Sequence, residues 1–178
     1  SFYQLLPILP LYIIEKFQTD NATAGFIISL YTIGALACRP FAGFLVDTLS
    51  RKPLYFWTFF AFTACFLGYK TVAFLPILAA VRFAHGLFFG ISSTASNTVA
   101  IDALPASRRG EGIGYFGISV NLAFATGPMT GMFLYEAFGD TIVFIISIAL
   151  CIIGLVLVQT LNVPRKEKKP HAPLSLDR

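Results

Sequence analysis

Residues 141–161, TIVFIISIALCIIGLVLVQTL, run for 21 positions without a charged side chain. A helix needs roughly 20 mostly apolar residues to cross the hydrocarbon core of a bilayer, and this stretch supplies them. Comparable stretches precede it along the chain. The predicted spans are residues 1–17, 22–46, 53–71, 74–100, 110–133 and 141–161. The sequence therefore predicts an all-α membrane protein with six transmembrane helices.

The composition agrees, with 56% hydrophobic residues, 12% charged residues and a mean hydropathy of +0.74, values unlike those of a water-soluble domain. A signal peptide ahead of a soluble domain does not fit, because the apolar stretches continue to residue 161. All three cysteines fall inside predicted spans, as small buried residues do. No zinc-type spacing, P-loop or nucleophile elbow occurs. We therefore expect no metal, no cofactor, no catalytic residue and no enzyme activity.

The basic residues are distributed unevenly between the two sides of these spans. Only Lys16 and Lys70 lie on one side. The opposite side carries Arg51, Lys52, Arg108, Arg109, Arg165, Lys166, Lys168, Lys169 and Arg178. Lys and Arg accumulate in cytoplasmic loops, so both termini are predicted to be cytoplasmic. The net charge of +4 is accounted for by this topology, and no nucleic acid partner is expected.

Two arginines lie inside predicted spans, where each costs at least roughly 2.5–3.5 kcal/mol at a helix centre. Arg82 lies roughly 12 Å from the start of its span at 1.5 Å per residue, which favours burial in the bundle or beside a cavity. For Arg39, burial and extension toward the nearby interface both remain open. His85 follows Arg82 by one turn. It is either a group that titrates near neutral pH or a hydrogen-bonded bystander.

Small residues at four-residue steps mark two spans as surfaces for close helix packing. The first series is Gly86, Gly90 and Thr94, and the second is Ser119, Ala123, Gly127 and Gly131. Polar residues between positions 92 and 98 indicate that the first of these spans also lines a cavity. Pro128 lies inside the second series and is expected to kink its helix. A pivot or seal and a purely structural kink both remain open for it.

A charged cluster ends the second span, where Gly43, Asp47, Arg51 and Lys52 follow one another closely. An aspartate at a helix C-terminus meets the negative end of the macrodipole, so Asp47 is expected to hold a cationic partner. The available partners on its side are Arg51, Arg108 and Arg109. Such an ion pair can act as a latch between conformations. A basic loop that only sets topology explains Arg51 and Lys52 but not Asp47.

These residues carry a resemblance to the major facilitator superfamily, most of all to its drug:proton antiporter branch. The segment 43–52, GFLVDTLSRK, resembles the hallmark G-x-x-x-D-R-x-G-R-R, with Thr48 and Ser50 as departures. Arg82 with His85 and Gly86 resembles the helix-four motif R-x-x-Q-G, with histidine in place of glutamine. Gly127, Pro128 and Gly131 resemble the helix-five antiporter motif. The prolines of residues 6–10, LPILP, resemble those of the first helix.

The resemblance implies one half of a transporter. Residues 1–162 are then an N-terminal six-helix bundle whose first helix is expected to be truncated. Residues 163–178 form a charged cytoplasmic linker to a second half outside this sequence. Two such halves rock about a central site to give alternating access. The short loops favour a bacterial inner membrane as the location.

The resemblance also implies roles for individual residues. Asp47, Arg51 and Lys52 latch one conformation, Arg82 with His85 takes part in proton coupling, and the helix-five motif seals the bundle. Contacts with a small-molecule substrate are expected from Gln4, Tyr31, Asn97 and Asn121.

We expect proton-coupled export, with protons, a small molecule and the lipid bilayer as partners. No acidic residue lies in the middle of a predicted span. An uncoupled facilitator or importer of the same fold, and a transport-inactive membrane scaffold, therefore remain as alternatives.

Overall fold

The computed structural model describes residues 2–161, and almost all of them lie in helices. The helices are α1 (Phe2–Leu5), α2 (Ile8–Phe17), α3 (Asn21–Ala37), α4 (Arg39–Thr48), α5 (Arg51–Thr71), α6 (Leu75–Asp102), α7 (Arg109–Phe138) and α8 (Asp140–Thr160). A single 3-10 turn, η1 (Ala106–Arg108), precedes α7. The predicted linker, residues 163–178, lies outside the described residues.

Prolines break two of the predicted spans into paired helices. The first span is interrupted at Leu6 and Pro7, between α1 and α2. The second bends by 45° between α3 and α4, immediately before Pro40, which has no N–H with which to continue the helical hydrogen bonds. Pro128, by contrast, lies inside α7 without interrupting it. The other four spans match single helices within a few residues.

The helices differ in how apolar they are. Among the described residues, α6 and α8 are each long and apolar enough to cross a membrane, and the bent pair of α3 and α4 passes the same test as one unit. Helices α5 and α7 have 21 and 30 residues, enough to span, but do not meet the same criterion for apolar composition. Polar and small residues lower the mean hydropathy of α5 and α7. Such residues are expected where a helix faces protein or a cavity rather than lipid.

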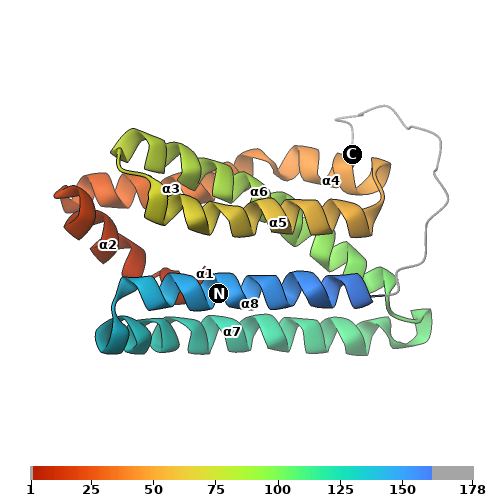
Figure 1. Cartoon of the computed structure of the whole chain (residues 1–178). Helices are drawn as coiled ribbons and strands as arrows, with labels where there is room; N and C mark the ends of the chain where they lie inside the picture. Colours follow the sequence, from red (N-terminus) through yellow and green to blue (C-terminus); the bar gives the residue numbers. More distant parts are fainter. Residues whose placement is uncertain (1, 162–178) are drawn as a thin grey trace.

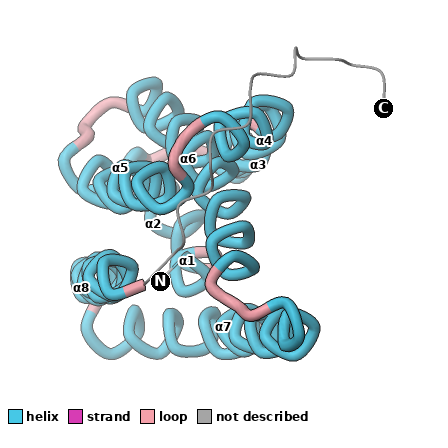
Figure 2. The backbone as a smooth tube through the Cα atoms, turned by 90° about the vertical axis from the view of Figure 1, so that its right-hand side faces the viewer, coloured by secondary structure: helices cyan, strands magenta, loops and turns pink. Residues whose placement is uncertain are grey.

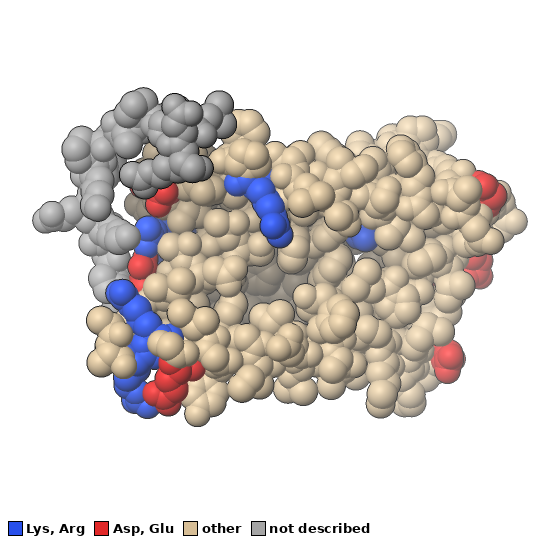
Figure 3. All heavy atoms as spheres, turned by 180° about the vertical axis from the view of Figure 1, so that it is seen from behind, with Lys and Arg blue, Asp and Glu red and all other residues tan. Residues whose placement is uncertain are grey.

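The helices form two layers (Figure 1). One contains α3, α4, α5 and α6, and the other contains α7 and α8, while α1 and α2 lie between them (Figure 2). Helix α6 packs most extensively against α3 and α5, and α1 packs against α7. Seen from behind, the surface is hollowed between the layers, and Lys and Arg gather at one end of the molecule (Figure 3).

Glycines bring α3 and α6 into backbone contact. A Cβ added at Gly86 would lie 2.1 Å from the carbonyl oxygen of Tyr31 on α3. One added at Gly34 would lie 2.4 Å from the carbonyl oxygen of Phe83. These distances leave no room for a side chain. The series that begins at Gly86 is therefore the surface on which α3 packs, and this contact fixes where Tyr31 lies.

Candidate functional site

Arg82 lies in the interior of the α3–α6 layer and is only 3% exposed. Its guanidinium carbon lies 4.6 Å from the ring centre of Tyr31, and the rings of Phe2 and Tyr69 flank it at 6.0 and 5.9 Å. A desolvated cation over an aromatic face gains up to about 2 kcal/mol from the ring quadrupole. The predicted interior position of Arg82 is therefore correct, and its immediate surroundings are aromatic.

Tyr69 links Arg82 to His85 in one buried network. The Arg82 Nη1 donates a hydrogen bond to the Tyr69 hydroxyl at 3.0 Å, and that hydroxyl lies 2.6 Å from His85 Nδ1. His85 itself has no exposed surface. Its ring packs against those of Phe62 and Phe66, with centres at 4.3 and 4.9 Å. Tyr69 of α5 and Arg82 and His85 of α6 thus form one polar cluster, and the Tyr31 ring lies against the Arg82 guanidinium. We call these four residues the Arg82 cluster.

The Arg82 cluster has more hydrogen-bond donors than acceptors. The buried Tyr31 hydroxyl, Arg82 Nε and His85 Nε2 have no hydrogen-bond partner among the described residues. The acidic residues of the described part all lie at or near helix ends: Glu15, Asp20, Asp47, Asp102, Glu111, Glu136 and Asp140. No ion pair is formed to Arg82 within residues 2–161. The cluster therefore holds a positive charge whose neighbours are aromatic and hydroxyl groups.

Tyr69 is the member of the cluster that sequence reasoning missed. It lies at the end of α5 beside Lys70, a position typical of aromatic residues at the membrane interface. Its side chain nevertheless turns inward and is 1% exposed. Its proximity to Arg82 depends on how α5 packs against α6. Spacing within one helix carries no information about that packing.

At the charged end of the molecule, Arg51 rather than Asp47 is the centre of the ion pairs. Arg51 forms a hydrogen-bonded ion pair with Asp102 at the end of α6, and a second ion pair, at 3.8 Å, with Asp47. The side chains of Arg51 and Asp102 are 13% and 15% exposed, whereas that of Asp47 is 78% exposed. The predicted contact of Asp47 with Arg51 is present. The more buried partner, Asp102, was missed because Arg51 and Asp102 lie 51 positions apart.

Arg108 and Arg109, at the start of α7, do not pair with Asp47 in this conformation. Arg108 binds Glu111, three residues on, at 2.9 and 3.1 Å, and Arg109 begins α7 as an exposed residue. The pairing of Asp47 with Arg108 that the sequence allowed is therefore not found here. The local pair prevails because i,i+3 neighbours on a helix surface already lie close together. Gly43 is exposed, with open space around its α-carbon.

Lys52 caps the C-terminal end of α8. Its Nζ donates hydrogen bonds to the carbonyl oxygens of Gln159 and Leu161 at 2.8 and 2.7 Å. The last carbonyls of a helix have no intrahelical partners, and a cation there also meets the negative end of the macrodipole.

We expect Lys52→Met to destabilise the end of α8 by about 0.3–1 kcal/mol. Faster amide hydrogen exchange confined to the last turn of α8 would be the observation. The exposed Lys16, at the opposite end of the molecule, provides the comparison: Lys16→Met should leave exchange in the last turn of α8 unchanged.

The helix-five motif packs against the first span. A Cβ at Gly131 would lie 2.1 Å from the carbonyl oxygen of Gln4, and one at Gly127 would lie 2.6 Å from the Cβ of Tyr3. Gln4 also donates a hydrogen bond to Thr130 at 3.3 Å. Gly127 and Gly131 are the only buried residues of α7. The motif is therefore the surface that holds α7 against α1.

The four predicted substrate contacts divide into two pairs. Gln4 and Tyr31 are buried at 9% and 6% exposure, while Asn97 on α6 and Asn121 on α7 are exposed. Phe2 stacks on Tyr31 with ring centres 4.6 Å apart, so Gln4 and Tyr31 belong to one region around α1. Within the described residues, no group of three His, Cys, Asp or Glu side chains is placed to hold a metal ion.

Comparison with known proteins gives a consistent result. The sequence model of the Major Facilitator Superfamily matches residues 1–177. An uncharacterized MFS-type transporter, YtbD of Bacillus subtilis, is 33% identical over 166 residues, which are 91% of this chain and 40% of the relative. The multi-drug resistance efflux pump PmrA of Streptococcus pneumoniae is 29% identical over 150 residues, 82% of this chain and 37% of the pump.

A Na(+), Li(+), K(+)/H(+) antiporter of Planococcus maritimus is 25% identical over 162 residues, covering 88% of this chain and 38% of the antiporter. This chain thus spans about 40% or less of the length of these three relatives. The family match, the all-helical fold and the apolar helices agree with one another. The chain belongs to the Major Facilitator Superfamily, a family of membrane transport proteins rather than enzymes.

Proposed function

We propose that this chain is the N-terminal half of a secondary transporter that exports small molecules in exchange for protons by alternating access. The observation that carries the proposal is the Arg82 cluster, a buried cation joined through Tyr69 to a histidine. An ionisable residue at membrane depth is costly and marks a substrate or proton pathway. The names of two relatives, an efflux pump and a cation/proton antiporter, support the direction and the coupling.

In this proposal the other motifs supply conformational control. Asp47, Arg51, Lys52 and Asp102 hold the cytoplasmic rim closed, and Gly127 and Gly131 keep α7 sealed against α1. Both termini face the cytoplasm of a bacterial cell, and the protein lies in its inner membrane. Residues 163–178 connect the bundle to a second six-helix half. The gathering of Lys and Arg at one end (Figure 3) supports this orientation.

The Arg82 cluster provides a proton site even though residues 2–161 hold no carboxylate in the middle of a span. In this proposal His85 is the group of the cluster that takes up the proton, and Arg82 supplies a fixed positive charge close to it. A change of charge on His85 must alter its hydrogen bond to Tyr69. That change is the step through which a proton acts on the packing of α5 against α6.

The proposal is tested with the complete protein in inside-out membrane vesicles, where a pH-sensitive dye reports proton movement as candidate compounds are added. We expect substrate-dependent proton flux that is lost in Arg82→Ala, by roughly tenfold or more if a charge-assisted hydrogen bond of about 1.5–3 kcal/mol is removed. Arg39→Ala is the matched control, since that arginine is exposed and outside the cluster. Flux that survives Arg82→Ala contradicts the proposal.

One alternative has a specific observation in its favour. Because the acidic residues among positions 2–161 lie at helix ends, a facilitator that moves its substrate without protons fits the same fold. Substrate uptake or release in the vesicle experiment without any proton movement identifies that alternative. A transport-inactive scaffold is not favoured, since it has no use for a buried cation.

A further inference from the structure

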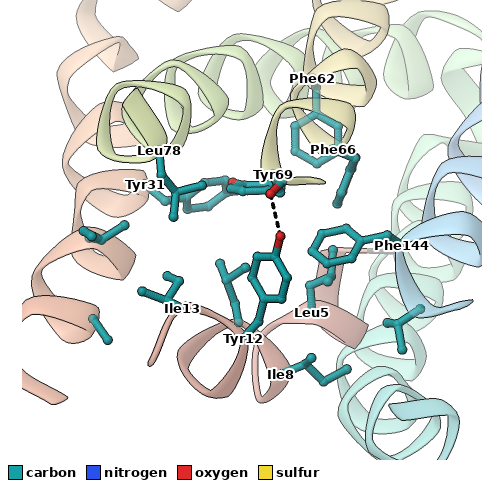
Figure 4. Close-up of a cluster of buried hydrophobic side chains, with 14 of the residues drawn as sticks. Leu5, Ile8, Tyr12, Ile13, Tyr31, Phe62, Phe66, Tyr69, Leu78 and Phe144 are labelled. Carbon is teal, nitrogen blue, oxygen red and sulfur yellow. Dashed lines mark hydrogen bonds between the residues drawn. The ribbon is translucent and has the colours of Figure 1, made fainter. Parts of the chain in front are cut away.

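Tyr69 makes two separate sets of contacts through the two ends of the same residue. Its hydroxyl contacts Arg82 and His85 in the bundle interior. Its backbone carbonyl, at the end of α5, accepts hydrogen bonds from the Tyr12 hydroxyl at 2.7 Å and from Lys16 Nζ at 3.1 Å. Figure 4 shows Tyr12 and Tyr69 approaching each other within the buried aromatic cluster.

The hydroxyl of Tyr69 determines which ring nitrogen of His85 carries the proton. Arg82 has no acceptor atom and can only donate, so its bond to Tyr69 uses a lone pair of the phenolic oxygen. The single phenolic proton is then free to be donated to His85 Nδ1, 2.6 Å away. Nδ1 is thereby an acceptor, and the neutral imidazole carries its proton on Nε2. This is the nitrogen that has no partner within residues 2–161.

The backbone carbonyl of Tyr69 is held by residues of α2, at the end of the bundle where α5 ends. Lys16 bonds to the carbonyl oxygens of Tyr69 and Lys70 and to the Tyr12 hydroxyl, the last two at 3.2 and 2.8 Å. Lys70 in turn forms an ion pair with Asp140 of α8 at 2.7 Å. These side chains border a surface pocket of about 360 Å³. The end of α5 is therefore fastened to α2 and α8 by polar contacts that leave the Tyr69 hydroxyl free for the cluster.

We infer that Tyr69 is a positioning residue that fixes the neutral tautomer of His85 and the orientation of Arg82 within the transport cycle. The inference rests on the proposed function, since it assigns a role within the same cluster. The groups that face His85 are Phe2 from α1, Tyr31 from α3, Phe62, Phe66 and Tyr69 from α5, and Arg82 from α6. Of these, Tyr69 alone hydrogen-bonds to the ring.

A charged His85 changes this arrangement. Protonation places a hydrogen on Nδ1, so the Tyr69 oxygen would face two donors, and its own proton would need a different acceptor. Either the phenolic proton turns to that acceptor, or the Tyr69 side chain turns away from His85 or from Arg82. In both cases the hydrogen bond that Tyr69 donates to Nδ1 is lost, while the Tyr69 backbone stays held by Tyr12 and Lys16.

The test measures the His85 ring directly and does not depend on transport. The complete protein is labelled with 15N-histidine, and His85→Gln identifies the His85 signals. We expect Nε2 to be protonated and the unprotonated Nδ1 to show the shift of a hydrogen-bond acceptor. In Tyr69→Phe that shift should move toward the value of a free ring nitrogen. Tyr12→Phe, which removes an equivalent hydroxyl on the carbonyl side, should leave both signals unchanged.

A second readout separates positioning from mere stability. In vesicles, Tyr69→Phe is expected to move the pH of half-maximal transport by about 0.7 unit, which corresponds to the loss of one hydrogen bond of about 1 kcal/mol. Tyr12→Phe should not. A proton on Nδ1 of the unmodified protein, or an unchanged Nδ1 signal in Tyr69→Phe, overturns the inference. Unmodified protein that shows the expected signals but moves no protons overturns the proposed coupling instead.

Discussion

Gly86→Ala is expected to destabilise the protein by on the order of 3 kcal/mol, the upper part of the range for overpacking a core. The new methyl carbon would lie 2.1 Å from the Tyr31 carbonyl oxygen and 2.8 Å from its carbonyl carbon. Both are backbone atoms, so no side chain can rotate to make room. Helices α3 and α6 must separate, and Tyr31 then loses its place beneath Arg82.

The measurement is thermal unfolding of the purified complete protein in detergent, together with the fraction that elutes as a monodisperse peak. Gly25→Ala is the matched control on α3, because a Cβ at that exposed position meets nothing within 4 Å. There the better helix propensity of alanine, up to about 1 kcal/mol, is expected to leave stability equal or slightly higher. Equal stability of the two variants would contradict the close packing of α3 on α6.

Asp102→Asn is expected to reduce stability by about 1.5–3 kcal/mol, the range for a hydrogen bond to a charged group. Arg51 at the start of α5 and Asp102 at the end of α6 are largely buried. The substitution removes the buried negative charge and leaves the exposed Asp47 as the carboxylate paired with Arg51 among the described residues. The asparagine keeps the size of the side chain, so the change isolates the charge.

Asp47→Asn provides the comparison for the same arginine. Its carboxylate is 78% exposed and lies 3.8 Å from Arg51, and exposed pairs contribute only about 0–1 kcal/mol. Chemical denaturation of both variants ranks the two acids. If Asp47→Asn is the more destabilising, Arg51 depends on Asp47 and the sequence-based assignment of the latch is the better one.

The positions of the helices were largely predictable because apolar composition changes sharply at their ends. The predicted span 53–71 corresponds to α5 (Arg51–Thr71), and 141–161 corresponds to α8 (Asp140–Thr160). The breaks were not predictable in the same way. Pro40 follows a bend of 45°, yet Pro128 lies within one continuous helix. Local sequence gives both prolines the same missing hydrogen bond, and packing against neighbouring helices decides the outcome.

The candidate site was predictable only in part, for a similar reason. The cost of burying a cation singled out Arg82 from its place in an apolar stretch. Its partner Tyr69 and the Arg51 partner Asp102 come from other helices, 13 and 51 positions away. No periodicity within a helix links such residues. The sequence favoured Asp47 as the partner of Arg51 because of its charge and its place in the 43–52 motif. Its side chain, however, lies on the exposed side of α4.

Helices α6 and α7 differ in how many of their residues are buried in the bundle. Only Gly127 and Gly131 are buried along its 30 residues, whereas eight residues of α6 are buried, Arg82 and His85 among them. The other contacts of α7 with the core come from half-buried side chains, those of Met132, Leu134 and Tyr135. The packing of this bundle therefore restricts side-chain size along much of α6, whereas on α7 the restriction is concentrated near the end that contacts α1.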